Sequence, residues 1–113
     1  MTTSGEDLPR RGDVWWVRVD KRRPAVVVQT DNVREPRVRS FLVVPLTSRV
    51  HFEGLPGNVR LNRRDSGLSK TSVANVYDVQ KVLREDFIER LGLLPGDQLE
   101  RIADGLRLVL DLM

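Results

Sequence analysis

The sequence predicts a mainly β fold with α: a small β-barrel of short strands plus helices, the main one at the C-terminus. Three observations lead to this class. With 113 residues, the chain can build one domain with a modest core. Short runs rich in β-branched residues alternate with polar segments that contain Gly and Pro, which is typical of strands and turns. From Leu99 to Met113, apolar residues recur every three or four positions, which predicts an amphipathic helix.

Three strands are predicted in the first half of the chain. Apolar and β-branched residues dominate three runs, at residues 13–19, 24–29 and 38–45. A charged hairpin turn at residues 20–23 joins the first two strands, and a polar loop at residues 30–37 precedes the third, which Pro45 ends. Trp15 and Trp16 are adjacent in the first strand, so their side chains must lie on opposite faces, one of them in the core.

The second half of the chain combines short strands with helical turns. A long loop at residues 46–56 comes first. Further strands are expected at residues 58–61, 72–76 and 79–83. Residues 84–87 suit one helical turn, whereas the spacing of apolar residues at 88–94 fits both a strand and a helix. Pro95 suits the first turn of the C-terminal helix and Asp97 suits its dipole.

Composition narrows the class of protein. Apolar residues make up 40% of the chain, so we expect a single globular domain at residues 11–113 behind a flexible tail at residues 1–10. The absence of cysteine excludes disulfides, thiolate zinc sites and a cysteine nucleophile, and it suits a cytoplasmic protein. The polar N-terminal segment lacks the apolar core of a signal peptide, and no apolar run is long enough for a membrane span.

Charge is distributed unevenly along the chain. The net charge is +3, but Lys and Arg outnumber Asp and Glu in residues 1–70, and the reverse holds in residues 71–113. A basic region favours an anionic partner, either a nucleic acid or an acidic protein segment. A solvated, arginine-rich surface explains the same imbalance equally well, so charge alone leaves both interpretations open.

Two strand ends carry the candidate chemistry. Arg23 precedes the apolar run of the second strand, where Pro24 favours an extended backbone, and Thr47 follows the third strand. If these strands pair antiparallel, Arg23 and Thr47 meet at the same edge of the sheet, together with Arg22 and Arg49. A guanidinium beside hydroxyl groups on rigid strand ends can bind a phosphate.

Other patterns that support phosphate chemistry are missing. The single histidine, His51, lies in a loop, which excludes the two-histidine mechanism of many ribonucleases. The acidic residues are scattered without metal-ligand spacing, and the sequence contains neither a P-loop nor a Gly-x-Ser-x-Gly motif. We therefore expect neither a metal site nor a cofactor.

Five short segments of the chain are informative together. They lie at residues 11–15 (Arg-Gly-Asp-Val-Trp), 22–28 (Arg-Arg-Pro-Ala-Val-Val-Val), 44–48 (Val-Pro-Leu-Thr-Ser), 68–72 and 89–92 (Glu-Arg-Leu-Gly). In this order and spacing they resemble the MazF/PemK family of toxin endoribonucleases, over about residues 10–112. The resemblance implies a MazF/CcdB-type fold, a Src-homology-3-type small barrel with a C-terminal helix. It also favours a strand at residues 88–94.

The resemblance implies roles for individual residues. Arg23 and Thr47 would be the catalytic pair of a metal-independent, sequence-selective endoribonuclease, in which the ribose 2′-OH attacks the neighbouring phosphodiester. The RNA-binding residues would be Arg22, Gln29, Ser48, Arg49, Asn75, Tyr77, Asp78 and Gln80. The structural alternatives are an Arg23 paired with Asp20 or Asp78, and a Thr47 that forms a turn.

Two departures from the family pattern concern selectivity and proton transfer. Residues 20–23 leave almost no loop between the first two strands, where many relatives carry a long loop that helps to hold RNA. Tyr77 stands where relatives often have an acid, with Asp78 next to it. Either Asp78 takes that place after a small shift, or Tyr77 stacks on a base.

The same resemblance implies the partners. As the toxin of a type II toxin–antitoxin system, the protein is expected to cleave single-stranded RNA, to block translation, to form a homodimer and to be neutralised by an acidic antitoxin. Two alternatives stay open: a non-enzymatic, CcdB-like toxin that inhibits a protein target, and a nucleic-acid-binding barrel. A CcdB-like toxin has no need of the Arg23 and Thr47 pair.

Overall fold

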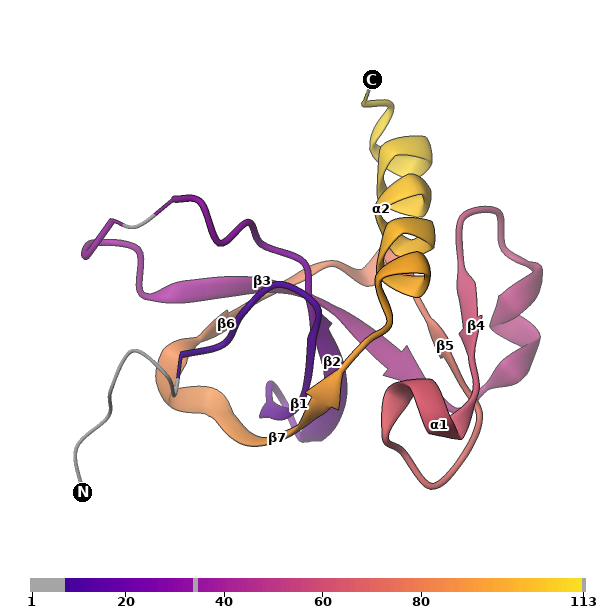
Figure 1. Ribbon diagram of the computed structural model, residues 1–113, viewed down its shortest axis with the longest axis horizontal. Helices are drawn as coiled ribbons and strands as arrows, with labels where there is room; N and C mark the ends of the chain where they lie inside the picture. The colour runs from indigo at the N-terminus through magenta and orange to yellow at the C-terminus, as the bar shows by residue number, and fades with distance from the viewer. Residues whose placement is uncertain (1–7, 34, 113) are drawn as a thin grey trace.

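The described part of the chain forms one antiparallel sheet with a long helix packed against it. The computed structural model describes residues 8–33 and 35–112. The strands are β1 (Asp13–Arg18), β2 (Arg22–Val27), β3 (Ser40–Thr47), β4 (Val59–Leu61), β5 (Ser72–Ala74), β6 (Gln80–Leu83) and β7 (Phe87–Leu93). The helices are α1 (Arg63–Ser66) and α2 (Gly96–Leu110), and the 3-10 turns are η2 (Val50–Gly54), η3 (Val76–Asp78) and η4 (Arg84–Asp86) (Figure 1).

The described strands form a seven-stranded sheet in the order β4–β5–β3–β2–β1–β7, with β6 also beside β3. β3 is the longest strand, and it pairs with β2 on one side and with β6 and then β5 on the other. The sheet is open, but its short strands and the C-terminal helix agree with the small-barrel class. The predicted fold class is therefore confirmed, as is the strand at β7.

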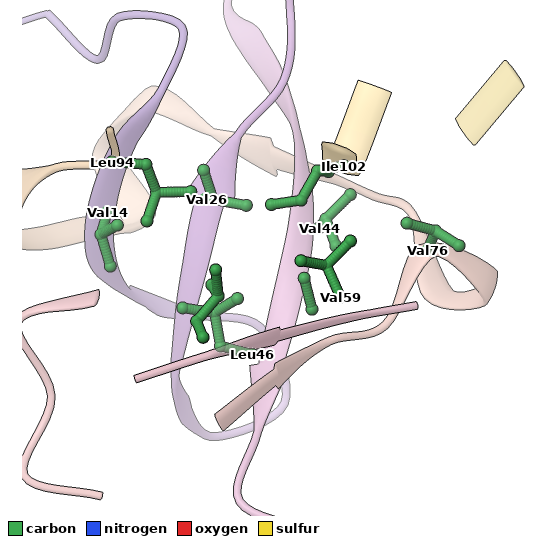
Figure 2. Packing of buried hydrophobic residues seen from close by; sticks show 10 residues of the cluster. Val14, Val26, Val44, Leu46, Val59, Val76, Leu94 and Ile102 are labelled. Carbon is green, nitrogen blue, oxygen red and sulfur yellow. The ribbon is translucent and has the colours of Figure 1, made fainter. Parts of the chain in front are cut away.

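Alternate residues of the central strands fill two apolar cores. The first core includes Val14, Val26, Val44, Leu46, Val59, Val76, Leu94 and Ile102 (Figure 2). The second includes Trp15, Val17, Ala25, Val27, Val43, Val82 and Phe87. Trp15 packs edge-on against Phe87 with 5.5 Å between ring centroids, whereas Trp16 is half-buried on the opposite face. The prediction that the two tryptophans face opposite ways is confirmed, and both faces of these strands are buried.

Pro45 lies inside β3 rather than at its end, which corrects the predicted boundary. It stands opposite Ala25 of β2, and its carbonyl accepts a 3.0 Å hydrogen bond from the N–H of Asn75. The N and C=O of one strand residue point to the same side of the strand. The missing N–H of Pro45 therefore faces the side of β3 that pairs with β6 and β5, at a position between these two pairings. The strand can therefore continue to Thr47.

Other boundaries also differ from the prediction. β2 spans Arg22–Val27 rather than residues 24–29, β3 begins at Ser40 rather than at residue 38, and β5 ends at Ala74, because Val76–Asp78 form a 3-10 turn. The expected loop at residues 46–56 is shorter, because β3 runs to Thr47 and Val50–Gly54 form a 3-10 turn. In α2, Ile102 is buried as predicted but Leu110 is exposed, so the apolar stripe ends before it. Residues 1–7 of the predicted tail and Met113 lie outside the described residues, while Pro9 is buried in the structure.

A close backbone contact seats α2 on the sheet. A Cβ built on Gly105 would lie 2.0 Å from the carbonyl oxygen of Gly57, and Gly57 itself has a φ of +94°, which favours glycine. This contact lies beside β4 and allows the buried Ile102 to reach the first core. Within the described residues, no helix combines the length and the apolar character that a membrane span requires.

Gly105→Ala is expected to lower the free energy of unfolding by about 2–3 kcal/mol, because the added methyl group collides with the backbone of Gly57. Gly96→Ala, in the same helix, is the matched control, since nothing lies within 4 Å of the methyl group that it adds. The control should change stability by at most about 1 kcal/mol, in the stabilising direction. Urea unfolding measures both changes, and equal midpoints for the two variants would contradict the proposed packing.

Candidate active site

The register of β2 on β3 brings Arg23 and Thr47 together. Val26 pairs with Val44 and Ala25 with Pro45, and Arg23 and Thr47 each lie two residues beyond the last of these pairs on its own strand. Both residues lie at the strand ends, where β2 begins and β3 finishes. The start of β2 and the end of β3 therefore lie at the same edge of the sheet.

Arg23 and Thr47 line an open, polar hollow of about 430 Å³, which we call the arginine hollow. Six of the ten predicted site residues line it: Arg23, Thr47, Ser48, Arg49, Asn75 and Asp78. Lys21 and Phe52 line it as well and were not among the predicted residues. Lys21 precedes the strand start that carries Arg23, and Phe52 is the one aromatic residue of the 46–56 segment. Both positions therefore gave weak evidence in the sequence for a place in the site.

Arg23 is held from the side by Asp20. Its Nε donates to Oδ1 of Asp20 at 3.2 Å and its Nη2 donates to Oδ2 at 3.4 Å. These hydrogen bonds lower the pKa of the Asp20 carboxyl, which therefore stays ionised. Among the described interactions, Nη1 of Arg23 has no acceptor, so the outer end of the guanidinium is available to a ligand.

Thr47 forms a turn and still has hydrogen-bonding capacity. Its Oγ1 accepts a 3.1 Å hydrogen bond from the backbone N–H of Arg49, which is the turn-forming role that the sequence left open. A hydroxyl group that accepts one bond keeps its proton to donate. The structural and the functional interpretations of Thr47, like those of Arg23, are therefore compatible.

Asn75 lines the arginine hollow, and a neighbouring asparagine helps to hold it. Asn75 caps η3 by accepting a hydrogen bond from the N–H of Tyr77, and it also accepts one from Nδ2 of Asn58 at 3.3 Å. Asn58 accepts in turn from the N–H of Val76 at 2.9 Å. Among the described residues, these bonds leave the side-chain N–H₂ of Asn75 without an acceptor, and they fix the turn that carries Asp78 into the hollow.

Four predicted site residues lie outside the arginine hollow. Gln29 is beyond the other end of β2, where its amide bonds the backbone of Ser40 and Leu42. Gln80 donates to Asp78 at 3.0 Å, so it contacts a residue of the hollow without lining it. Tyr77 is exposed, and its hydroxyl donates to the carbonyl of Pro56.

Arg22, the fourth residue, lies on the opposite face of β2 from Arg23. Its guanidinium carbon is 4.7 Å from the centroid of the Trp16 ring, and its Nη2 is 3.6 Å from a carboxylate oxygen of Glu89. The alternation of side chains along a strand explains why neighbouring arginines reach different surfaces. Arg22 therefore contributes to the face that carries Trp16.

The described residues contain no cluster of metal-ligating side chains. Within residues 8–33 and 35–112, no group of three or more His, Cys, Asp and Glu side chains converges to hold an ion. His51 is exposed and packs edge-on against Phe52, with 4.6 Å between ring centroids. The arginine hollow therefore offers guanidinium, ammonium, hydroxyl and amide groups to a ligand, which suits a phosphodiester.

Comparisons with known proteins show which family the chain matches. Residues 10–110 match the family described as PemK-like, MazF-like toxin of type II toxin-antitoxin system. Endoribonuclease MazF6 of Mycobacterium tuberculosis is 30% identical over 110 residues, which cover 90% of this chain and 96% of that protein.

Solved structures share the fold. The Mycobacterium tuberculosis toxin MazF-mt6 has a TM-score of 0.78 and 26% identity, over 89% of this chain and 98% of that chain. A mycobacterial endoribonuclease in complex with its cognate antitoxin has a TM-score of 0.75 and 20% identity, over 95% of this chain and 97% of that chain.

Proposed function

Because the chain belongs to the PemK-like, MazF-like toxin family of type II toxin–antitoxin systems, we propose that it is a metal-independent, sequence-selective endoribonuclease, an mRNA interferase that cleaves single-stranded RNA and so blocks translation. The observation that carries the proposal is that Arg23 and Thr47, at the ends of paired strands, line the same open, polar hollow. Those two residues are the proposed catalytic pair.

In the proposed reaction the nucleophile belongs to the RNA. The ribose 2′-OH attacks the adjacent phosphorus and the 5′-oxygen of the next nucleotide leaves, which yields a 2′,3′-cyclic phosphate and a 5′-hydroxyl. The protein must align the chain and stabilise the negative charge that develops on the non-bridging oxygens. Arg23 supplies a planar cation with several N–H donors for that charge.

The ion pair with Asp20 fits this role. It is solvent-exposed, with 71% of the Asp20 side chain accessible, and exposed pairs contribute little to stability. Asp20 contacts Nε and Nη2, so it orients the guanidinium while Nη1 stays available for the phosphate. The Thr47 hydroxyl donates to a second oxygen from the facing strand. Arg49 and Lys21 supply additional positive charge around the backbone of the RNA.

Arg23→Lys is expected to lower single-turnover cleavage roughly 100- to 1000-fold, because lysine keeps the charge but loses the fork that holds two oxygens. Thr47→Val keeps the shape without the hydroxyl and should cost about 10- to 100-fold. The measurements are cleavage rates and thermal melts of each purified variant.

Arg37→Lys is the matched control for Arg23→Lys. Arg37 also pairs with a nearby carboxylate, that of Glu35, at 2.6 Å, but it does not line the arginine hollow. The control should cut RNA as fast as the wild type. A folded Arg23→Lys protein that cuts within about threefold of wild type would mean that Arg23 is structural and that the active site lies elsewhere.

Cleavage should persist in excess EDTA, because the cation that stabilises the transition state belongs to Arg23. The products should carry 2′,3′-cyclic phosphate and 5′-hydroxyl ends, which end-labelling before and after phosphatase treatment distinguishes. Loss of activity in EDTA with recovery on adding magnesium would refute this mechanism. Intact RNA under every condition would instead favour a non-enzymatic toxin.

We also propose a homodimer that an acidic antitoxin neutralises. Leu93, Leu108 and Leu112 are each at least 60% exposed, which leaves apolar surface for a second copy to cover. A protein of the same fold is known in complex with its cognate antitoxin. Light scattering should give twice the monomer mass, and an acidic antitoxin should displace RNA with an affinity that falls as salt rises. A monomer, or RNA and antitoxin bound together without competition, would contradict the proposal.

A further inference from the structure

A second hollow adjoins the arginine hollow. It has a volume of about 420 Å³ and lies between the Trp16 face of the sheet and residues 67–72. Pro24, Leu46 and Ser48 line both hollows, so the two are continuous around the edge where β2 begins and β3 ends. A strand of RNA whose phosphate lies at Arg23 would therefore have room for a neighbouring nucleotide in the second hollow.

Ser72 is the unusual residue of the second hollow. It is 2% exposed, yet its Oγ has no hydrogen-bond partner among the described residues. Buried hydroxyl groups are normally satisfied, because an unpaired one loses its bonds to water without replacement. Ser72 lines the second hollow, so a ligand held there could supply the missing partner.

A second hydroxyl group, that of Ser48, lines the same hollow. Ser48 follows Thr47, the last residue of β3, and lines the second hollow as Ser72 does. A serine hydroxyl both donates and accepts, so the two together can meet the mixed donors and acceptors on the edge of a nucleobase.

An aromatic ring completes the lining. Trp16 is half-buried and lines the second hollow, while Arg22 covers its ring at 4.7 Å from the centroid. Single-stranded nucleic acids bind through such combinations of aromatic rings, which stack on bases, and cations, which meet phosphates. Lys70 is exposed at the same hollow and can meet a phosphate there.

We propose that the second hollow binds one nucleobase of the RNA, next to the cleaved phosphate, and that Ser72 is a residue that determines sequence preference at that position. This inference rests on the proposed ribonuclease function. Trp16 stacks on the base, and the hydroxyl of Ser72 bonds its edge. A site built to hydrogen-bond a substrate discriminates against bases that leave its buried group unpaired.

The test compares wild type, Ser72→Ala and Ser40→Ala on a long RNA pool under single-turnover conditions, with the 5′ ends of the products sequenced. Ser72→Ala should melt like the wild type and still cut, because its hydroxyl has no partner in the described protein. Its base preference at one position beside the cut should fall about tenfold, as one hydrogen bond is lost. Ser40→Ala, at the far end of β3, should keep the wild-type preference.

An active Ser72→Ala protein with wild-type base preferences would overturn the base pocket and leave the ribonuclease intact. Intact RNA with the wild-type protein would instead refute the ribonuclease, and the pocket with it. A Ser72→Ala protein altered only in self-association by light scattering would show that a second copy of the chain, rather than RNA, fills the second hollow.

Discussion

The site depends on the register of strand β3. This one strand pairs with β2 on one side and with β6 and β5 on the other, so it sets the positions of three neighbours at once. A slip of one residue against β2 would turn every side chain of β3 to the opposite face. Thr47 would then no longer face Arg23, and the two groups that define the arginine hollow would separate.

Burial makes that slip costly. Val44 packs in the first core and Val43 in the second, so both faces of β3 are apolar and closely packed. The strand ends that carry Arg23 and Thr47 extend directly from these buried segments. A charge-stabilising group works best when it is already in place before charge develops, and rigid strands provide that placement better than loops. The cores therefore contribute to the site without touching it.

The parts of the site that could be predicted are those set by backbone pattern. The apolar runs on either side of residues 30–37 indicate two strands, and antiparallel pairing then brings Arg23 to Thr47. The position of Gln29 could not be predicted this way. Its amide bonds the backbone of β3, and the pattern of apolar residues in the sequence does not indicate such a contact. The end of β3 was predicted wrongly, because the effect of Pro45 on a strand depends on which neighbour its missing N–H faces.

Other features depend on side-chain geometry alone. The continuous apolar runs predict that β2 and β3 are buried, but they do not show that the hydroxyl of Ser72 lacks a partner. They also do not show that Gly105 must contact the backbone of Gly57. Both properties arise from the approach of segments distant in sequence, which periodicity within one segment does not record.

The ion pair between Asp20 and Arg23 affects the guanidinium both before and during the proposed reaction. The pKa of Asp20 is lowered by its hydrogen bonds to Arg23, so the carboxylate stays charged well below neutral pH and competes with any phosphate for the guanidinium. Because the pair is exposed, that competition is weak. A phosphodiester in its ground state carries one negative charge, but the charge on its non-bridging oxygens grows toward the transition state. In the proposed mechanism Asp20 keeps Nε and Nη2 of Arg23 in place while Nη1 meets the phosphate. The attraction to the phosphate then grows as charge develops on its oxygens, which is the difference in binding that accelerates a chemical step.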